Sequence, residues 1–191
     1  MNDRHQIITL PNPSLHKKSA KVFPITKVTQ QTIANMTTIG LDWEDHHAHE
    51  VTVGLAAVQI NKLEKIIIIR NDFDNKSDRT FRALINPVLL KADGKKVYEL
   101  EGCLSVAGFY GRVKRYSNVR IQALDEQGSV VKISATGFLA RLLQHEIDHI
   151  NGKTYLDRLD ENGELYRMLP NGKLELLADE EAKSILSELS K

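Results

Sequence analysis

The stretch Gln144-His145-Glu146-Ile147-Asp148-His149 decides how the rest of the chain has to be arranged. It reads H-E-x-x-H, with two imidazoles four residues apart and a carboxylate beside the first. On an α-helix four residues advance about 400°, so the two histidines lie on nearly the same face, about one turn apart. Such a pair can bind one metal ion, and Glu146 could take a proton from a water on that metal. A surface helix that carries two histidines fits the bare pattern as well.

A catalytic metal of this kind needs three protein ligands and one open position. One group of zinc proteases extends the motif to H-E-x-x-H-x-x-G-x-x-H. Gly152 fits this extension, but the next ligand position holds Tyr155. Cys103 is the only thiol, and a lone cysteine can be buried filler, a nucleophile or a metal ligand. A Cys, His, His set is chemically sound, because thiolate and imidazole both suit a borderline-soft divalent ion.

Composition and charge narrow the class of protein. A chain of 191 residues is long enough for one domain with a substantial core, so we expect residues 1–191 to form a single domain. The net charge of +1 offers no electrostatic case for binding DNA, RNA or a membrane surface. The N-terminus lacks a signal-peptide profile and the apolar runs are too short to span a bilayer. We therefore expect a cytoplasmic protein without DNA or membrane partners.

Hydrophobic periodicity predicts three helices. The first starts at Thr26, loses its pattern around Asp45 to Glu50, and buries Val28, Ile33, Met36, Ile39 and Trp43. The motif helix runs from about Thr136-Gly137 to Gly152, a good residue to follow a helix C-terminus. A third, amphipathic helix runs from about Asp179 to Leu189, and Ser14 could cap a short helix near the N-terminus.

Runs of β-branched residues predict the strands, which are Ile66 to Arg70, Arg82 to Leu90, Val97 to Leu100, Val119 to Leu124 and Val130 to Ala135. We expect turns at 92–95 and 125–128, and an edge position or a bulge at Asn86-Pro87. The predicted class is therefore α+β, with mixed and antiparallel strands around a central helix that carries the H-E-x-x-H motif.

Two polar features are ambiguous from local pattern alone. Gln59 stands among apolar residues, so it is either buried with a hydrogen-bond partner or exposed at a tight helix start. The segment around His46, His47 and His49 resembles a ligand set, but it is polar on every side. Because nothing nearby would hold its geometry, we predict a solvated loop there.

Three motifs in order resemble the peptide deformylase family. The family carries G-x-G-L-A-A-x-Q, then E-G-C-L-S, then Q-H-E-x-D-H, which correspond here to Thr52 to Gln59, Glu101 to Ser105 and Gln144 to His149. The resemblance extends over most of the chain. Thr52 replaces the leading glycine, and Ala107 replaces a proline that often follows the second motif. These departures concern the shape of the cleft and the rigidity of a loop, and neither removes a ligand or the base.

The resemblance implies a metal held by Cys103, His145 and His149, with a water in the fourth place. It further implies ferrous iron in the cell, with nickel, cobalt or zinc possible in purified protein, although coordination chemistry alone would suit zinc. Glu146 would accept the proton of the water, and hydroxide would attack the formyl carbon of an N-formylmethionyl peptide. The side-chain amide of Gln59 and the backbone N–H of Leu104 would then meet the oxyanion.

The substrate cleft is a weaker inference from the same resemblance. The candidates for it are Val53, Gly54, Leu55, Glu101, Gly102, Phe138 and Leu142. Plain core packing is the alternative for the apolar ones. A buried carboxylate needs a cation, so we also hypothesise an ion pair between Glu101 and Arg115 that supports the cleft. The alternative is two exposed, unpaired charges.

Two other functions remain open on the sequence. A general H-E-x-x-H peptidase is disfavoured by the missing downstream ligand, and a catalytically silent metal-binding relative has only the Thr52 and Ala107 departures in its favour. Similar enzymes use a C-terminal extension to dock on the ribosome. Here the acidic residues of the last helix are a poor complement to RNA phosphate, so we expect a transient ribosome contact at most and ordinary packing of that helix.

Overall fold

The computed structural model describes residues 6–47 and 51–189. Its helices are α1 (Lys27–His46), α2 (Gly137–Ile150) and α3 (Asp179–Leu189), and its 3₁₀ turns are η1 (Pro13–His16), η2 (Ala57–Ile60) and η3 (Tyr155–Arg158). The strands are β1 (Gly54–Ala56), β2 (Ile66–Arg70), β3 (Phe81–Gly102), β4 (Phe109–Leu124), β5 (Val130–Thr136), β6 (Leu165–Met168) and β7 (Leu174–Leu176). No helix within these ranges is both long and apolar enough to cross a bilayer.

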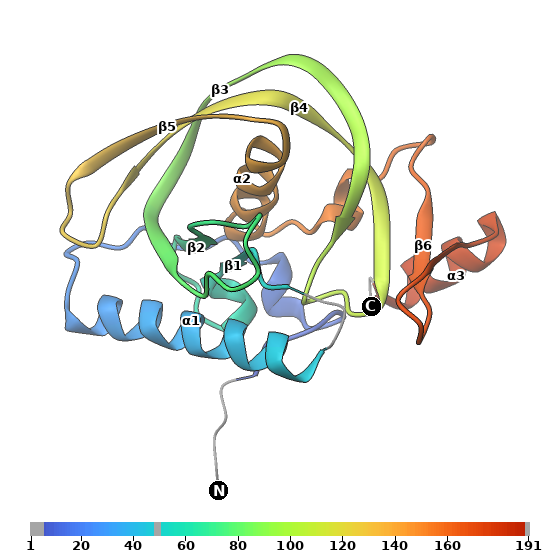
Figure 1. Ribbon diagram of the computed structural model, residues 1–191, viewed down its shortest axis with the longest axis horizontal. Coiled ribbons are helices and arrows are strands. Elements are labelled where there is room, and N and C mark those ends of the chain that lie inside the picture. Colours follow the sequence, from blue (N-terminus) through green and yellow to red (C-terminus); the bar gives the residue numbers. More distant parts are fainter. Residues whose placement is uncertain (1–5, 48–50, 190–191) are drawn as a thin grey trace, which may run out of the picture.

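One antiparallel sheet joins all seven strands in the order β1-β2-β3-β4-β6-β7, with β5 paired to β4. The long strands β3 and β4 arch over α2, and α1 lies on the other side of β1 and β2 (Figure 1). The arrangement confirms the predicted α+β class. Among the described residues, the parallel contact is the isolated bridge between Ala20 and Glu64.

The predicted turn at 92–95 is wrong, because β3 runs through it without reversing. The register against β4 instead shifts between Asp93 and Lys96, and Gly94 adopts a φ of +79°. A bulge of this kind bends a strand and increases its twist, which lets the hairpin curve over α2. A second shift between Ile85 and Val88 confirms the bulge predicted at Asn86-Pro87. The edge alternative is wrong, since β3 lies between β2 and β4.

Both N-terminal helix predictions need a correction. Helix α1 begins after Thr26, whose side chain accepts a hydrogen bond from the Val28 N–H, but Val28 itself is 70% exposed. Ile33 and Met36 are buried as predicted, Ile39 and Trp43 pack against the same cluster, and the buried face also includes Thr29 and Gly40. Turn η1 is capped by Asn12, which accepts from the Ser14 N–H, and not by Ser14.

Strand β2 separates two apolar clusters and confirms the prediction of a strand buried on both faces. Ile67 and Ile69 pack with the α2 residues Leu143 and Ile147, whereas the alternate residues of β2 pack toward α1. Helix α2 is therefore clamped between the arch and the β2 layer. Helix α3 forms where it was predicted, with its apolar stripe only partly buried.

Candidate active site

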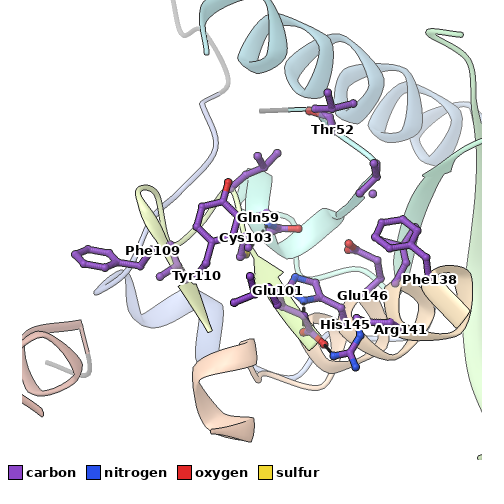
Figure 2. Close-up of a pocket in the computed structure, with 18 of the residues that line it drawn as sticks. Thr52, Gln59, Glu101, Cys103, Phe109, Tyr110, Phe138, Arg141, His145 and Glu146 are labelled. Carbon is purple, nitrogen blue, oxygen red and sulfur yellow. Dashed lines mark hydrogen bonds and ion pairs between the residues drawn. The ribbon is translucent and has the colours of Figure 1, made fainter. Parts of the chain in front are cut away.

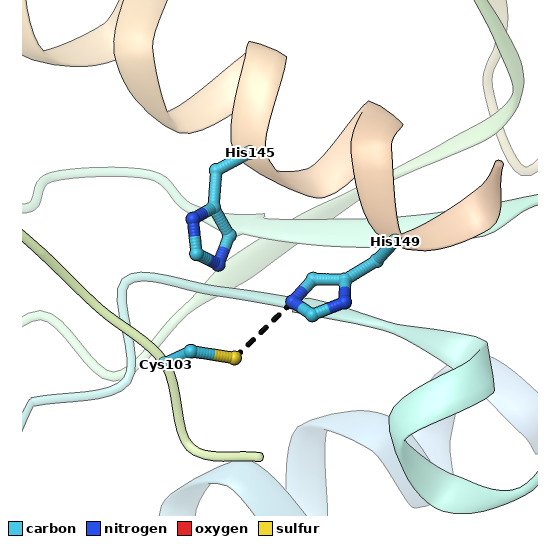
Figure 3. Close-up of side chains that lie close together, drawn as sticks. All are labelled: Cys103, His145 and His149. Atoms are coloured by element: carbon cyan, nitrogen blue, oxygen red, sulfur yellow. Dashed lines mark hydrogen bonds between the residues drawn. The ribbon is translucent and has the colours of Figure 1, made fainter. Parts of the chain in front are cut away.

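The two motif histidines and the single cysteine converge from separate elements. Helix α2 carries His145 and His149, and Cys103 follows directly after β3. One ligand atom from each of the three residues can be chosen so that all lie within 4.8 Å of one another. The Cys103 Sγ atom lies 3.2 Å from the His149 Nε2 atom (Figure 3). A thiolate and two imidazoles at this separation match the donor set of a tetrahedral site with one open position.

The two imidazoles are held differently. The His145 Nδ1 atom lies 3.0 Å from the Glu101 Oε2 atom, which leaves Nε2 to face the cluster. This carboxylate–histidine contact is the usual outer partner of a metal ligand, because it fixes the orientation and the tautomer of the ring. His149 is fully buried, its Nδ1 atom has no hydrogen-bond partner within the described chain, and burial lowers its pKa well below the ordinary value. Burial therefore favours the neutral form of this ring, which is the form that binds a metal.

Glu101 lies at the centre of a buried network of charges. Arg115 donates to both of its carboxylate oxygens over 2.9 Å, so the predicted ion pair is confirmed. Both side chains are about 5% exposed. Arg115 also contacts Asp148 on α2, which receives a further pair of hydrogen bonds from Arg158. Burial opposes ionisation of Glu101, but hydrogen bonds from His145 and Arg115 outweigh it and hold its pKa well below the ordinary value.

Sequence reasoning missed Arg141, which also holds Glu101. Its Nη1 atom lies 2.7 Å from Glu101 Oε1, and it donates to the carbonyl oxygens of Val97 and Val113. The guanidinium thus ties α2 to both long strands. A signal was present in the sequence: Arg141 stands four residues before His145 and shares its helix face. An arginine between the leucine-rich first turns and the buried histidine face of this helix requires buried acceptors.

Glu146 is buried and faces the cavity beside the cluster (Figure 2). Its Oε2 atom has no hydrogen-bond partner among the described residues, and burial raises its pKa to about 7. Gly54 makes room for this carboxylate, because a Cβ atom at Gly54 would lie 2.7 Å from Glu146 Oε1. A carboxylate with a pKa near neutrality is suited to accept and return a proton at physiological pH.

Gln59 is buried and has hydrogen-bond partners, so the alternative of an exposed side chain at a helix start is wrong. Its Oε1 atom accepts from the Ala56 N–H over 2.8 Å, and its Nε2 atom donates to Ser105 Oγ over 3.1 Å. The same amide nitrogen lies 3.6 Å from Cys103 Sγ. Leu104 follows the cysteine and lines the same cavity, and its N–H has no partner within the part of the chain that the structure describes. Two N–H donors therefore border the cluster.

The cluster opens into a cavity of about 440 Å³. The candidate substrate residues that line it are Val53, Gly54, Glu101, Gly102, Phe138 and Leu142. The assignment of Leu55 to the cleft is corrected, because Leu55 is fully buried in the apolar cluster with Ile66 and Ile68 and does not line the cavity. Side chains alternate along a strand, so once Gly54 faces the cavity, Leu55 faces the core.

Thr52, the first departure from the family pattern, is held firmly. It is 1% exposed, its hydroxyl donates to the Gly40 carbonyl oxygen over 2.7 Å, and its own carbonyl oxygen accepts from Arg70 Nε. A Cβ atom at Gly40 would lie 2.9 Å from the Thr52 methyl group, so the glycine in α1 accommodates the larger residue. Ala107, the second departure, is exposed.

His46 and His47 lie apart from this site, along a separate pocket with Ile39 and Trp43. His46 is the last residue of α1 and is exposed, which corrects its prediction as a loop residue. The His47 ring stacks on Trp43 with centroids 3.9 Å apart. His49 lies outside the described residues. Within the described chain, the group able to hold a metal ion is Cys103, His145 and His149.

Comparison with known proteins gives a consistent result. The family described as polypeptide deformylase matches residues 4–164. The chain is 40% identical to the peptide deformylase of Halothermothrix orenii over 159 residues, which is 83% of this chain and 96% of that protein. It is 36% identical to the peptide deformylase of Thermomicrobium roseum over 168 residues, covering 86% and 90% of the two chains.

Solved structures show the same relationship in three dimensions. The crystal structure of a peptide deformylase from Legionella pneumophila superposes with a TM-score of 0.71 at 34% identity, covering 81% of this chain and 85% of the other. A Plasmodium falciparum peptide deformylase superposes with a TM-score of 0.74 at 26% identity, covering 96% and 94%. The fold is therefore shared over at least four fifths of this chain and of both solved structures.

Proposed function

This chain belongs to the peptide deformylase family, and from that premise we propose how its own residues carry out the reaction. It is a metal-dependent hydrolase that removes the formyl group from the N-terminus of N-formylmethionyl nascent peptides and releases formate. The observation that carries the residue assignment is that ligand atoms of Cys103, His145 and His149 lie within 4.8 Å of one another, beside a cavity that Cys103 and His145 line.

The donor set fits a single divalent ion held by Cys103, His145 and His149. Thiolate and imidazole both suit a borderline-soft cation, and the burial of His149, which lowers its pKa, supports the same role. We propose ferrous iron in the cell, with nickel, cobalt or zinc in purified protein. When bound, the ion would supply Lewis-acid activation of a water molecule and of the formyl oxygen.

The groups around the three ligands have two roles: one transfers the proton and the others stabilise negative charge. Glu146 removes the proton of the attacking water, and the same carboxyl group returns it to the departing amine, so formate and a free N-terminus result. The amide N–H of Gln59 and the backbone N–H of Leu104 donate to the oxygen that gains negative charge. The contact between Gln59 and Ala56 holds the amide in the orientation that this role needs.

The methionine side chain occupies the part of the cavity next to Glu146. Phe138 and Leu142 from α2 line it together with Val53 and Gly54, and Gly54 lies against Leu142 and Glu146. Gly102 and Glu101, which precede Cys103 in the chain, also line the cavity. The Phe138 ring also packs against Phe73, with centroids 5.1 Å apart, which supports its position.

The direct test is formate release from formyl-Met-Ala-Ser by protein loaded anaerobically with ferrous iron, alongside the Glu146→Gln variant. We expect rapid release by the natural chain and very slow release by the variant. Equal rates with metal present would support the catalytically silent alternative. Cleavage of an internal peptide bond without formate release would support the peptidase alternative. Tyr155 argues against that alternative, because it occupies the third-ligand position of such peptidases and its hydroxyl donates to the Phe109 carbonyl oxygen.

We further propose that residues 1–191 act as one domain in the cytoplasm, where nascent peptides emerge. A transient contact with the ribosome fits this role. The three acidic residues in the first turn of α3 make that helix a poor partner for RNA, so the proposed contact uses another surface.

A further inference from the structure

The cavity has a second apolar wall, distant from the proposed methionine site. Leu100 from β3, Phe109 and Tyr110 from β4, and Leu174 from β7 line it. Figure 2 shows Phe109 and Tyr110 on the other side of the metal-binding residues from Phe138 and Glu146. Leu100 is 45% exposed and Leu174 is 37% exposed, so these side chains form the mouth of the cavity and not its base.

Leu174 is held at this mouth by regular strand pairing. Strand β6 pairs with the start of β4, with Tyr110 opposite Tyr166, and β7 pairs with β6, with Leu174 opposite Met168. The Tyr110 hydroxyl lies 3.8 Å from the Met168 sulfur, and the Met168 N–H donates to the Gly108 carbonyl oxygen over 2.8 Å. The β6–β7 hairpin is thus a continuation of the sheet, with Leu174 in a fixed place.

One residue of this wall, Leu174, lies outside residues 4–164, the part of the chain that matches the family. The match ends at residue 164, and β6, β7 and α3 follow it. The ion pair between Arg167 on β6 and Glu181 on α3 joins the last two elements. Leu174 is therefore a contribution of this chain's C-terminal segment to a cavity that the preceding residues otherwise build.

The geometry of the reaction determines which part of the substrate contacts this wall. The formyl carbon must lie beside Cys103 and Glu146, and the substrate continues from its methionine as a peptide chain that has to leave through the mouth. The charged residues of the lining, Glu101, Arg141, His145 and Glu146, all belong to the inner site. A side chain at the mouth meets apolar groups, which favour an apolar partner.

We propose that the β6–β7 hairpin, through Leu174, selects nascent peptides with an apolar residue soon after the formyl-methionine. This inference rests on the proposed function and deepens it. Because the wall is only half-buried, the selection is modest: an apolar side chain gains about fivefold in kcat/KM over a small or acidic one.

Two peptide series test the proposal on iron-loaded enzyme, formyl-Met-X-Ala-Ser and formyl-Met-Ala-X-Ser, with leucine, alanine or glutamate at X. The natural chain should prefer leucine about fivefold in at least one series, and Leu174→Ala should reduce that ratio to below twofold. Leu176→Ala is the matched control, because Leu176 belongs to the same strand but does not line the cavity. It should retain the full preference.

Calorimetric titration of iron-loaded Glu146→Gln protein with the same peptides gives a readout without turnover, and the Leu174→Ala change should remove the same preference in affinity. A leucine preference unchanged by Leu174→Ala, or no preference at all, would overturn the selection while leaving deformylation intact. Absence of formate from every formylated peptide would instead overturn the proposed function, and this inference with it.

Discussion

The two ends of the cavity are built on different principles. The inner end is held by buried charges: Glu101 alone receives hydrogen bonds from Arg115, Arg141 and His145. The mouth is apolar and half-exposed, and its wall includes Leu100 and Leu174. Buried polar groups tolerate few arrangements because each unpaired group is costly, whereas an apolar wall is tolerant of exchange. The difference indicates that the inner end fixes the chemistry, whereas the residues of the mouth can vary and thereby change substrate preference.

The largest effect should follow removal of the inner base. Glu146→Gln preserves the size of the side chain but cannot accept a proton, so we expect kcat/KM for formyl-Met-Ala-Ser to fall by about 10³-fold. Bound iron, measured per chain, should be unchanged. Activity within tenfold of the natural chain would remove Glu146 from the mechanism.

A hundredfold loss should follow removal of the amide donor. Gln59→Leu retains the shape of the side chain and loses its N–H groups, so kcat should fall by about 10²-fold, as expected for one donor to a developing oxyanion. The Ala56 N–H would also lose its acceptor. Gln59→Glu separates the two effects, because it retains an acceptor for Ala56 but not the donor. Recovery of full kcat by this second variant would contradict the donor role.

The next largest effect should follow disruption of the buried charge network around Glu101. Arg115→Met leaves Glu101 and Asp148 with fewer partners, so we expect a loss of about 3–5 kcal/mol in the free energy of unfolding and metal affinity lowered about 10–100-fold. Arg112→Met is the control, because Arg112 lies on the same strand in an exposed pair with Glu164, which should be worth at most about 1 kcal/mol. Equal losses in the two variants would show that the buried network has no special weight.

The smallest effect should come from the mouth. Leu100→Ala removes apolar surface that is already 45% exposed, so KM for formyl-Met-Leu-Ala-Ser should rise about threefold while kcat stays within twofold. Unfolding by urea should be nearly unchanged. A fall in kcat as large as that of Gln59→Leu would mean that the mouth contributes to the chemical step as well as to substrate binding.

Much of this comparison was predictable from the sequence, and the failures have physical causes. Spacing alone placed His145 and His149 on one helix face, and the cost of a buried carboxylate predicted the Glu101–Arg115 pair. Spacing could not bring Cys103 to the helix, since that depends on the path of the long hairpin. The resemblance to the family supplied this contact.

The errors arose where a local pattern has two meanings. Gly94 predicts a turn, yet its positive φ is equally compatible with a bulge inside a continuing strand. Leu55 was a candidate for the cleft with core packing as its alternative, and the alternation of β1 directs it to the core. Leu174 could not be recognised from the sequence, because its role depends on the pairing of β6 with β4.

The most direct measurement is the visible and near-ultraviolet absorption of the protein titrated with cobalt(II) under anaerobic conditions. A metal shared by Cys103, His145 and His149 predicts one cobalt per chain and a thiolate-to-cobalt charge-transfer band that disappears in Cys103→Ser. Leu176→Ala should leave the band unchanged. Cobalt bound by the natural chain without such a band, or a band that survives in Cys103→Ser, would contradict the account.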